Sequence, residues 1–506
     1  MSEIPQEELF ECRNGQVIID PSISEKMYLI KREHPERGDG EATAYEWSEM
    51  GMAELFGVLY EKDCRYCPER KRWYTYYDGA WRKDEGEMLV SAKIKEFCRL
   101  MLLYCGEIED DDLRGTYIKF VNRMGDRRMR DRIMKDARDV LPISAAEFDA
   151  DPYLINCLNG TYNLRNCTFH EHRWSDFLTM QTNFRHTVRR DVKCERWEQF
   201  IDEVCEGNKD KADYLQRALG YSLLGFSNEE CMFILWGKTT RNGKSTLLNT
   251  IQHMLGDYAR VAPVALICKD KNASRDGEGA SPVLASLKGR RFVTMAESNE
   301  YGKLDEEKIK QMTGGEEISA RELYESAMTF TPQFTLWLSC NDLPAVTDQS
   351  LFSSERLRVI EFTKHFSQQE QDKHLKEEFM AQDAMQGIFM WLVRGFKRYR
   401  QCGLEMPESM KGVVRQYEKD NDVVGQFLEA NCVKDNRENV RVKFKVVYER
   451  YKLWAKSEGF RVMGVQKFCG EMDRHPDFHK GRSVYCGANV WEGLRFKEVS
   501  DVLSGN

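Results

Sequence analysis

A lysine, a serine and a threonine stand together between an apolar run and a helix-like pattern in Phe233–Ile251. The run FILW favours a β-strand, and LLNTI at Leu247–Ile251 resumes with helical spacing. Backbone N–H groups at a helix start bind anions, and a Gly-Lys-Ser turn adds a close-approaching backbone, a cation and a hydroxyl. The stretch therefore predicts a phosphate cradle, or P-loop, in which Lys244 contacts the β- and γ-phosphates of ATP and Ser245 ligates Mg²⁺.

The loop before this helix departs from the usual P-loop spacing. Five residues separate Gly237 from Gly243, and Lys238 occupies the place of the first glycine. An ordinary β–α turn with an exposed lysine is the alternative interpretation. Because the strand, loop and helix context is intact, we expect nucleotide contacts from Gly237, Arg241, Asn242, Gly243, Lys244, Ser245 and Thr246.

Two further polar side chains follow predicted strands. Glu297 ends the strand RFVTMA, and Asn341 ends the strand FTLWLSC. Ligands bind at the carboxyl ends of parallel strands, so both residues are candidates for the same site. Glu297 would hold the water shell of Mg²⁺ and polarise the attacking water, whereas Asn341 would position that water without adding charge. The alternatives are a simple strand-ending charge and a turn-forming asparagine.

These residues need a scaffold of parallel strands. A chain of 506 residues predicts about three domains. Residues 231 to about 365 alternate short β runs with helices, which indicates an α/β class with a parallel sheet. We expect an N-terminal α+β region at 1–145, a helical collar at 146–225, the P-loop core at 226–405 and a winged-helix-like module at 406–506. Asp78-Gly79 and Asn159-Gly160 predict hairpins.

Composition narrows the possible partners. Hydrophobic residues make up 41% and charged residues 31% of the chain, and no apolar run approaches the roughly 18 residues of a membrane span. The acidic start lacks the layout of a signal peptide, so we expect a cytoplasmic protein without a membrane partner. The net charge is −8, so any nucleic-acid surface must be a local cluster of Lys and Arg.

Two other sequence features leave alternatives open. The basic stretch Arg114–Arg138 is either a solvated helix with internal ion pairs or a face that contacts DNA. The 16 cysteines are scattered and are expected to be reduced thiols. Cys64-x-x-Cys67, the only close pair, makes at most half of a zinc site.

With these motifs in order, the chain resembles the phage and plasmid primase–helicase family, whose relatives include the poxvirus primase–helicase. The resemblance covers residues 50 to 500, and its motifs are RNGKST (Arg241–Thr246), AES (Ala296–Ser298), KQMTGGEEISARELY (Lys310–Tyr324), WLSCNDLP (Trp337–Pro344) and TDQSLFSSERLRVIEF (Thr347–Phe362). It implies a superfamily 3 helicase motor on an AAA+ fold. We expect the helicase part alone, with priming by a separate primase.

The resemblance also implies roles for single residues. Lys244, Glu297 and Asn341 are the expected catalytic residues of this chain, with Ser245 and Glu297 at the metal. Arg356 resembles an arginine finger that reaches the ATP of a neighbouring subunit, with Arg358 as the alternative finger. An ion pair with Glu355 or Asp348 is the structural alternative for Arg356. Contacts to DNA are expected from a hairpin carrying Lys310, Arg321 and Tyr324.

The resulting hypothesis is an ATP-dependent DNA helicase that forms a homo-oligomeric ring, a hexamer, and acts on single-stranded and forked DNA in replication of a phage or mobile element. One alternative is an initiator that uses ATP to assemble on an origin without processive unwinding. Another is a P-loop enzyme acting on small molecules. ATP turnover that ignores single-stranded DNA would favour the last of these.

Overall fold

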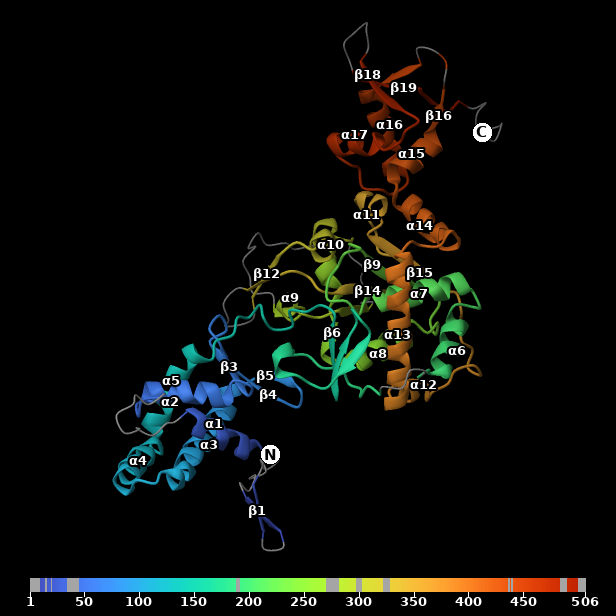
Figure 1. The fold of residues 1–506 in the computed structure, drawn as a ribbon. Helices are drawn as coiled ribbons and strands as arrows, with labels where there is room; N and C mark the ends of the chain where they lie inside the picture. The colour runs from blue at the N-terminus through green and yellow to red at the C-terminus, as the bar shows by residue number, and fades with distance from the viewer. Residues whose placement is uncertain are drawn as a thin grey trace.

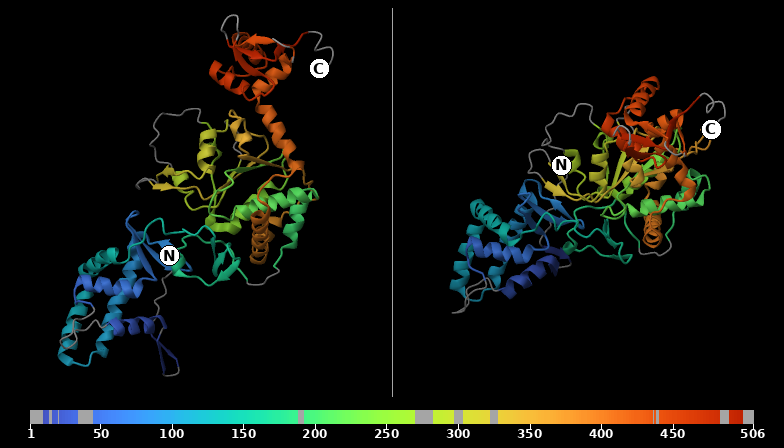
Figure 2. Two further views of the ribbon diagram at one scale, coloured as in Figure 1. Left: turned by 45° about the horizontal axis from the view of Figure 1, so that its top comes forward. Right: turned by 90° about the horizontal axis from the view of Figure 1, so that it is seen from above.

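The computed structural model describes residues 10–13, 16–19, 21–33, 45–187, 192–269, 282–296, 303–321, 328–435, 437, 440–482 and 489–498. The N-terminal helices and the C-terminal module lie at opposite ends of an elongated molecule, with the main sheet between them (Figure 1). The left view of Figure 2 shows the same separation, and the view from above shows the N-terminal helices to one side of the main sheet. Each part has its own hydrophobic core.

The N-terminal part is a helical core with a small sheet beside it. One apolar cluster runs from Ile23 to Leu141. Tyr77 pairs with Ala80, so the hairpin predicted at Asp78-Gly79 is confirmed. The elements are β1 Phe10–Arg13, β2 Gln16–Ile19, α1 Pro21–Glu33, α2 Glu49–Tyr60, β3 Cys64–Cys67, β4 Arg72–Tyr77, β5 Ala80–Lys83, α3 Met88–Tyr104, α4 Asp111–Met124 and α5 Arg127–Val140.

The basic stretch forms two helices rather than the expected single one. The chain breaks at Gly125, between α4 and α5. Arg132 lies 3.1 Å from Glu49 and Arg138 lies 2.8 Å from Glu87. These arginines therefore bind other parts of the N-terminal region, which favours the ion-pair interpretation of α5.

A second small sheet precedes the main one. It contains β6 Leu154–Cys157, β7 Gly160–Asn163 and β8 Thr168–His170, and the helices α6 Glu195–Val204 and α7 Lys209–Tyr221 follow. The predicted hairpin exists, but Cys157 pairs with Gly160. The turn residues are therefore Leu158 and Asn159, one position earlier than the Asn-Gly pair suggested.

The main sheet has five parallel strands in the order β10-β11-β14-β9-β15, which confirms the α/β class. The strands are β9 Met232–Trp236, β10 Ala259–Val261, β11 Phe292–Ala296, β14 Thr335–Cys340 and β15 Leu357–Glu361. Four consecutive buried residues in β9 are typical of a central strand that is covered on both faces.

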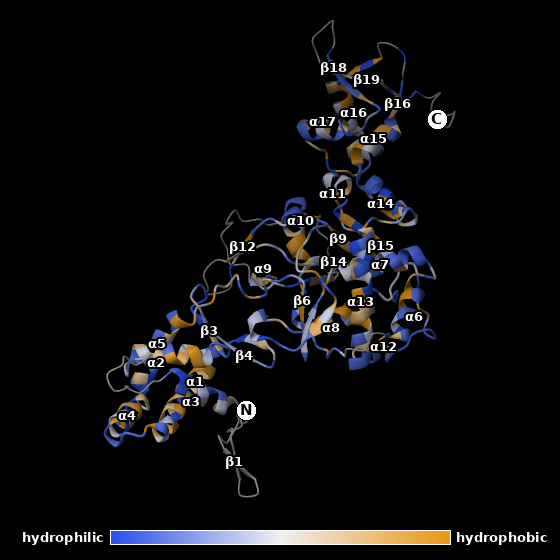
Figure 3. Ribbon diagram, viewed as in Figure 1, coloured by the Kyte–Doolittle hydropathy of each residue, from blue (hydrophilic) through white to orange (hydrophobic). Residues whose placement is uncertain are grey.

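The two faces of this sheet carry separate cores. Phe233 and Leu235 of β9 belong to one core, and Met232 and Ile234 belong to the other, because successive strand side chains alternate. The first core also includes α6 and α7, so the boundary expected near residue 225 passes through it. The remaining elements are α8 Lys244–Leu255, α9 Pro282–Ala285, α10 Glu306–Thr313, β12 Ile318–Ala320, β13 Met328–Phe330, α11 Ser350–Ser353, α12 Leu375–Phe379, α13 Gln382–Cys402 and α14 Glu408–Asn421. Figure 3 shows strongly apolar residues on α2, α8 and α13.

The C-terminal module is built from helices and short antiparallel strands. Tyr417 of α14 still packs in a core of the main sheet, and the module's own core begins at Val424. Lys467 donates to the carbonyl of Thr347, which links the module to the main sheet. The module contains α15 Val423–Asn431, β16 Cys432–Lys434, β17 Arg441–Lys443, α16 Phe444–Ser457, α17 Val465–Met472, β18 His479–Arg482, β19 Asn489–Glu492 and β20 Leu494–Phe496. None of the helices in the described ranges combines the length and apolar character needed to cross a bilayer.

Candidate nucleotide-binding site

The junction of β9 and α8 depends on Gly243. This residue precedes α8 with a φ of 86°, a conformation that favours glycine. A Cβ atom there would lie 2.6 Å from Cγ1 of Val204 and 3.2 Å from the ring of Phe200. Both neighbours belong to α6, so the loop is packed against the helix in front of it.

The first glycine of the loop is also closely surrounded. A Cβ atom on Gly237 would lie 2.5 Å from Nδ2 of Asn242 and 3.2 Å from Nζ of Lys244. The buried Asn242 donates from Nδ2 to the carbonyl of Thr239 at 2.6 Å. The side chain of Asn242 therefore stabilises the loop from within, although the glycine spacing of the loop is unusual.

Lys244 and Asn341 meet directly. The lysine is only 4% exposed. Its Nζ donates to the carbonyl of Gly237 at 3.1 Å and to Oδ1 of Asn341 at 3.0 Å. A buried ammonium group beside a glycine cradle is suited to a bound nucleotide phosphate.

The strand ends around Lys244 lie side by side. Cys340 pairs with Trp236, and Ala296 pairs with Ser339. The carboxyl ends of β9, β14 and β11 therefore occupy neighbouring positions at one edge, where ligands bind in α/β sheets. Glu297 follows β11 in sequence and lies outside the described residues.

The other predicted nucleotide residues form one wall of a cavity of about 330 Å³. Arg241 and Ser245 are exposed, and Thr246 is half-buried. The cavity is lined by Arg196, Phe200, Glu203, Arg241, Asn242, Gly243, Ser245, Thr246, Phe366, Glu370, Gln371, Asp372, Lys373, Leu375 and Lys376. Sequence reasoning missed the contribution of α6 and of residues 366–376, because neither segment carries a recognisable motif.

The segment after β15 closes over the loop. The N–H group of Phe366 donates to the carbonyl of Arg241 at 2.9 Å. A ring nitrogen of His365 lies 2.8 Å from the carbonyl of Thr240. These contacts position Phe366 and the residues after it beside the P-loop, where they can contact the non-phosphate part of a nucleotide.

No group of three or more potential His, Cys, Asp or Glu metal ligands occurs in the described ranges. Among the described residues, the hydroxyl of Ser245 at the start of α8 remains the predicted ligand for magnesium. Burial raises the pKa of the Cys64 and Cys67 thiols. The pair does not belong to a group of three or more potential ligands in the described ranges, so it stays half of a zinc site there.

Arg356 lies at the amino ends of the parallel strands, whereas the P-loop lies at their carboxyl ends. It precedes β15, and its carbonyl accepts from Met232 at the start of β9. Arg356 therefore lies beside the start of β9, whereas Gly237 follows its end. At about 3.3 Å per residue, the length of β9 separates these two residues by about 16 Å. Its guanidinium binds Glu230 at 2.5 Å and Thr313 at 2.8 Å. The structural alternative of an ion pair is thus observed, with a different partner from the two expected.

Arg358 differs from Arg356 in its surroundings. Its side chain is 10% exposed and lies 3.1 Å from Glu355. Arg358 belongs to β15, whose residues Leu357–Ile360 are buried. The side chain of Arg356 is 15% exposed, so the two arginines are similarly buried and exposure does not decide which of them is the finger.

The predicted DNA-contacting residues are not all in one place. Lys310 lies on α10, where its Nζ binds the hydroxyl of Ser350 at 2.9 Å and Asp348 at 3.5 Å. β12 and β13 form the predicted hairpin, and the exposed Arg321 directly follows β12. Tyr324 lies outside the described residues. The structure therefore supports a hairpin position for Arg321 and removes Lys310 from the hairpin.

Three sequence families match consecutive parts of the chain. The D5 N-terminal-like family matches residues 53–206, a family of unknown function matches 235–356, and the poxvirus D5 protein-like family matches 419–494. Among curated proteins, "Putative helicase L207/L206" of Acanthamoeba polyphaga mimivirus is 24% identical over 419 residues, which covers 76% of this chain and 43% of that protein. "Putative helicase 121R" of Invertebrate iridescent virus 3 is 23% identical over 382 residues, covering 69% and 39%.

The chain thus spans less than half the length of these curated relatives. A solved structure, the NrS-1 C-terminal region, matches with a TM-score of 0.48 and 11% identity, over 88% of this chain and 99% of that chain. The chain is a relative of the primase–helicase family that includes the poxvirus D5-like proteins.

Proposed function

We propose that this chain is the ATP-driven motor of a replicative DNA helicase. The contact between Lys244 and Asn341 carries the proposal, because it joins a buried P-loop lysine to the end of the neighbouring strand at 3.0 Å. A strand-end amide beside the lysine is suited to hold the water that attacks a γ-phosphate. The helicase names of the viral relatives favour nucleic acid over a small molecule as the second substrate.

Different residues of the chain have different roles at the phosphate site. Lys244 exchanges its contacts with Gly237 and Asn341 for phosphate oxygens, which frees the Asn341 amide to orient water. Ser245 and Glu297 would hold the magnesium ion and its water shell. Bound ATP·Mg²⁺ supplies the phosphoryl group to be transferred and the metal's positive charge.

The position of Arg356 supports a site shared between subunits. It lies across the sheet from its own P-loop, so it serves a neighbouring subunit's nucleotide once it leaves Glu230. This arrangement makes hydrolysis depend on assembly, and we propose a homo-oligomeric AAA+ ring of the superfamily 3 type, a hexamer. The β12–β13 hairpin, with Arg321, would contact the DNA strand.

The C-terminal module supports a second DNA contact. The module combines three helices with a three-stranded antiparallel sheet, a combination that is compatible with a winged helix. We propose that this module binds duplex DNA near the ring. A separate primase is the further partner proposed here.

Strand displacement on a forked duplex tests the proposal. The parental protein is expected to unwind the fork with ATP, and single-stranded DNA is expected to stimulate hydrolysis. Lys244→Ala removes the cation on the phosphates and is expected to abolish both activities. DNA-stimulated hydrolysis without strand displacement would instead favour an origin-assembling initiator, and hydrolysis indifferent to DNA would overturn the proposal.

A further inference from the structure

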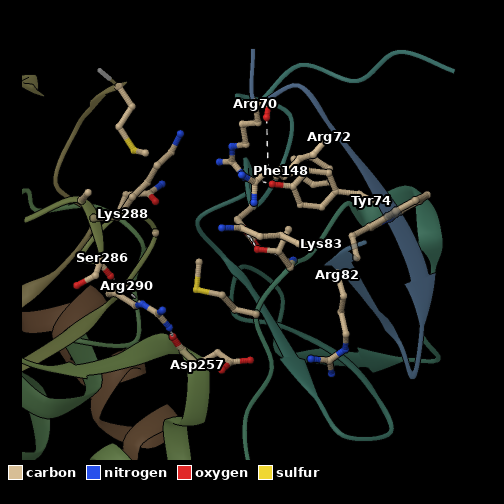
Figure 4. A pocket seen from close by; sticks show the side chains of 18 residues that line it. Arg70, Arg72, Tyr74, Arg82, Lys83, Phe148, Asp257, Ser286, Lys288 and Arg290 are labelled. Atoms are coloured by element: carbon tan, nitrogen blue, oxygen red, sulfur yellow. Dashed lines mark hydrogen bonds between the residues drawn. The ribbon is translucent and has the colours of Figure 1, made fainter. Parts of the chain in front are cut away.

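A cationic cavity lies between the N-terminal sheet and the main sheet, away from the P-loop. Its volume is about 360 Å³, and β4, β5 and residues 285–290 contribute to its lining. Figure 4 shows side chains from both sides converging on it, with Lys288 and Arg290 across from Arg70. The basic lining residues are Arg70, Arg72, Arg82, Lys83, Lys288 and Arg290, and the acidic ones are Asp149 and Asp257.

Among the described residues, most of the basic side chains that line the cavity form no ion pair with a carboxylate. This holds for Arg70, Arg82, Lys83, Lys288 and Arg290. Arg82 instead donates to Oε1 of Gln181 at 3.1 Å. Burial, and then the neighbouring Arg70, lower the pKa of Lys288. Like charges held together in a partly desolvated space are stabilised by an anion.

The two acidic residues are occupied by other contacts. Asp149 accepts from the N–H group of Thr179 at 2.8 Å and from its hydroxyl. Burial raises the pKa of Asp149. Asp257 accepts from the N–H group of Gln181 at 3.2 Å. The two carboxylates lie near enough to favour the charged forms of Arg70, Lys288 and Arg290, but they are outnumbered by the six basic side chains, so the cavity keeps an excess of positive charge.

The cavity floor is aromatic but is not open for base stacking. Tyr74, Trp81 and Phe148 line the cavity and are all buried. Tyr74 instead accepts a hydrogen bond from Arg70 at 2.5 Å, and the Arg70 guanidinium lies 6.0 Å from the ring of Phe148. The aromatic side chains thus hold the Arg70 guanidinium in place. A site lined by such cations recognises phosphates rather than bases.

The cavity adjoins the hairpin assigned to DNA. Met328, the first residue of β13, and Gln333, just before β14, both contribute to its lining. A strand held at the β12–β13 hairpin would therefore pass next to Lys288 and Lys83. We propose that this cavity binds the phosphodiester backbone of single-stranded DNA as a second contact beside the hairpin. The inference rests on the proposed function, because it assumes DNA as the substrate.

The salt dependence of DNA binding tests this site. Lys83→Gln and Lys288→Gln keep most of the side-chain stem and remove one charge each. Binding of the full chain to a fluorescent oligo(dT) would be measured by anisotropy without nucleotide, over a range of salt concentrations. Removing one lysine–phosphate interaction is expected to reduce the slope of log K against log[salt] by about 0.7, and the double variant should reduce it by about 1.4.

The matched control is Lys397→Gln, an exposed lysine on α13 away from the cavity. Competition with pyrophosphate and with an ATP analogue separates a strand site from a free-anion site. Weaker DNA binding with the reduced slope, and unchanged binding of the ATP analogue, would support the inference. Slopes equal to that of Lys397→Gln would overturn it, as would loss of pyrophosphate binding alone.

The outcome is distinguishable from failure of the proposed function. The measurement needs no hydrolysis and can be repeated in a Lys244→Ala background, where the motor is expected to be inactive. A parental chain that unwinds forks while the cavity variants bind DNA normally would contradict only this site. A parental chain that does not bind single-stranded DNA would contradict both proposals.

Discussion

Replacing Gly243 by alanine tests whether the loop geometry creates the nucleotide site. At a φ of 86°, the methyl group costs about 1–2 kcal/mol because the left-handed region crowds a Cβ atom. The same methyl group would lie 2.6 Å from Cγ1 of Val204. Val204 is fully buried and β-branched within α6, so it cannot easily rotate away. Overpacking of this kind adds about 1–3 kcal/mol.

The two terms together amount to about 2–5 kcal/mol, which corresponds to at least about a 30-fold loss of nucleotide affinity if the loop must adopt this conformation to bind. Titration with a fluorescent ATP analogue and thermal unfolding would be measured on the same sample. The matched control is Gly412→Ala in α14, where a Cβ atom meets nothing within 4 Å. That change is expected to stabilise the helix by about 1 kcal/mol. Parental affinity and parental melting temperature in Gly243→Ala would refute the reasoning.

Three further changes probe other contacts. Asn341→Ala is expected to leave ATP-analogue binding within a few-fold of the parental value but to reduce turnover about 100-fold, because the amide orients the attacking water; equal turnover in steady-state assays would refute this role. The Arg291 guanidinium donates to two buried carbonyls at 2.8 and 2.6 Å, and Arg291→Met leaves both without donors. The free energy of unfolding in urea should fall by about 3 kcal/mol. A fall below about 0.5 kcal/mol would contradict the argument. Burial lowers the pKa of His186, so on acidification the unfolded chain binds a proton at this residue before the folded chain does. The free energy of unfolding should therefore be at its full value above about pH 6.5 and should fall as the pH drops below that value. In urea titrations, His186→Phe should make this fall shallower.

The contact between Lys244 and Asn341 could be predicted because its signals are local. Gly-Lys-Ser after a buried strand predicts the loop, and the strand-end argument predicts that Asn341 reaches the same edge. The 3.0 Å contact between Lys244 and Asn341 is the structural counterpart of that prediction. The parallel sheet likewise followed from alternating short β runs and helices.

Features that depend on tertiary packing could not be predicted in this way. Arg356 binds Glu230, which is distant in sequence, rather than the nearby Glu355 or Asp348. The α6 and α7 helices share a core with the main sheet, a relationship that no local pattern encodes. The cationic cavity joins residues near 70–83 to residues near 285–290, two segments that each carry several Lys and Arg residues but lie far apart in sequence.

The shared active site can be tested by mixing two inactive variants. Lys244→Ala lacks a working P-loop but retains Arg356, whereas Arg356→Ala retains the P-loop and lacks the finger. In randomly mixed rings, an interface that combines the intact P-loop of one variant with the intact arginine of the other should occur in about a quarter of cases, so ATPase activity should return to about a quarter of the parental rate. Mixtures as inactive as each variant alone, or full activity of Arg356→Ala by itself, would contradict the account.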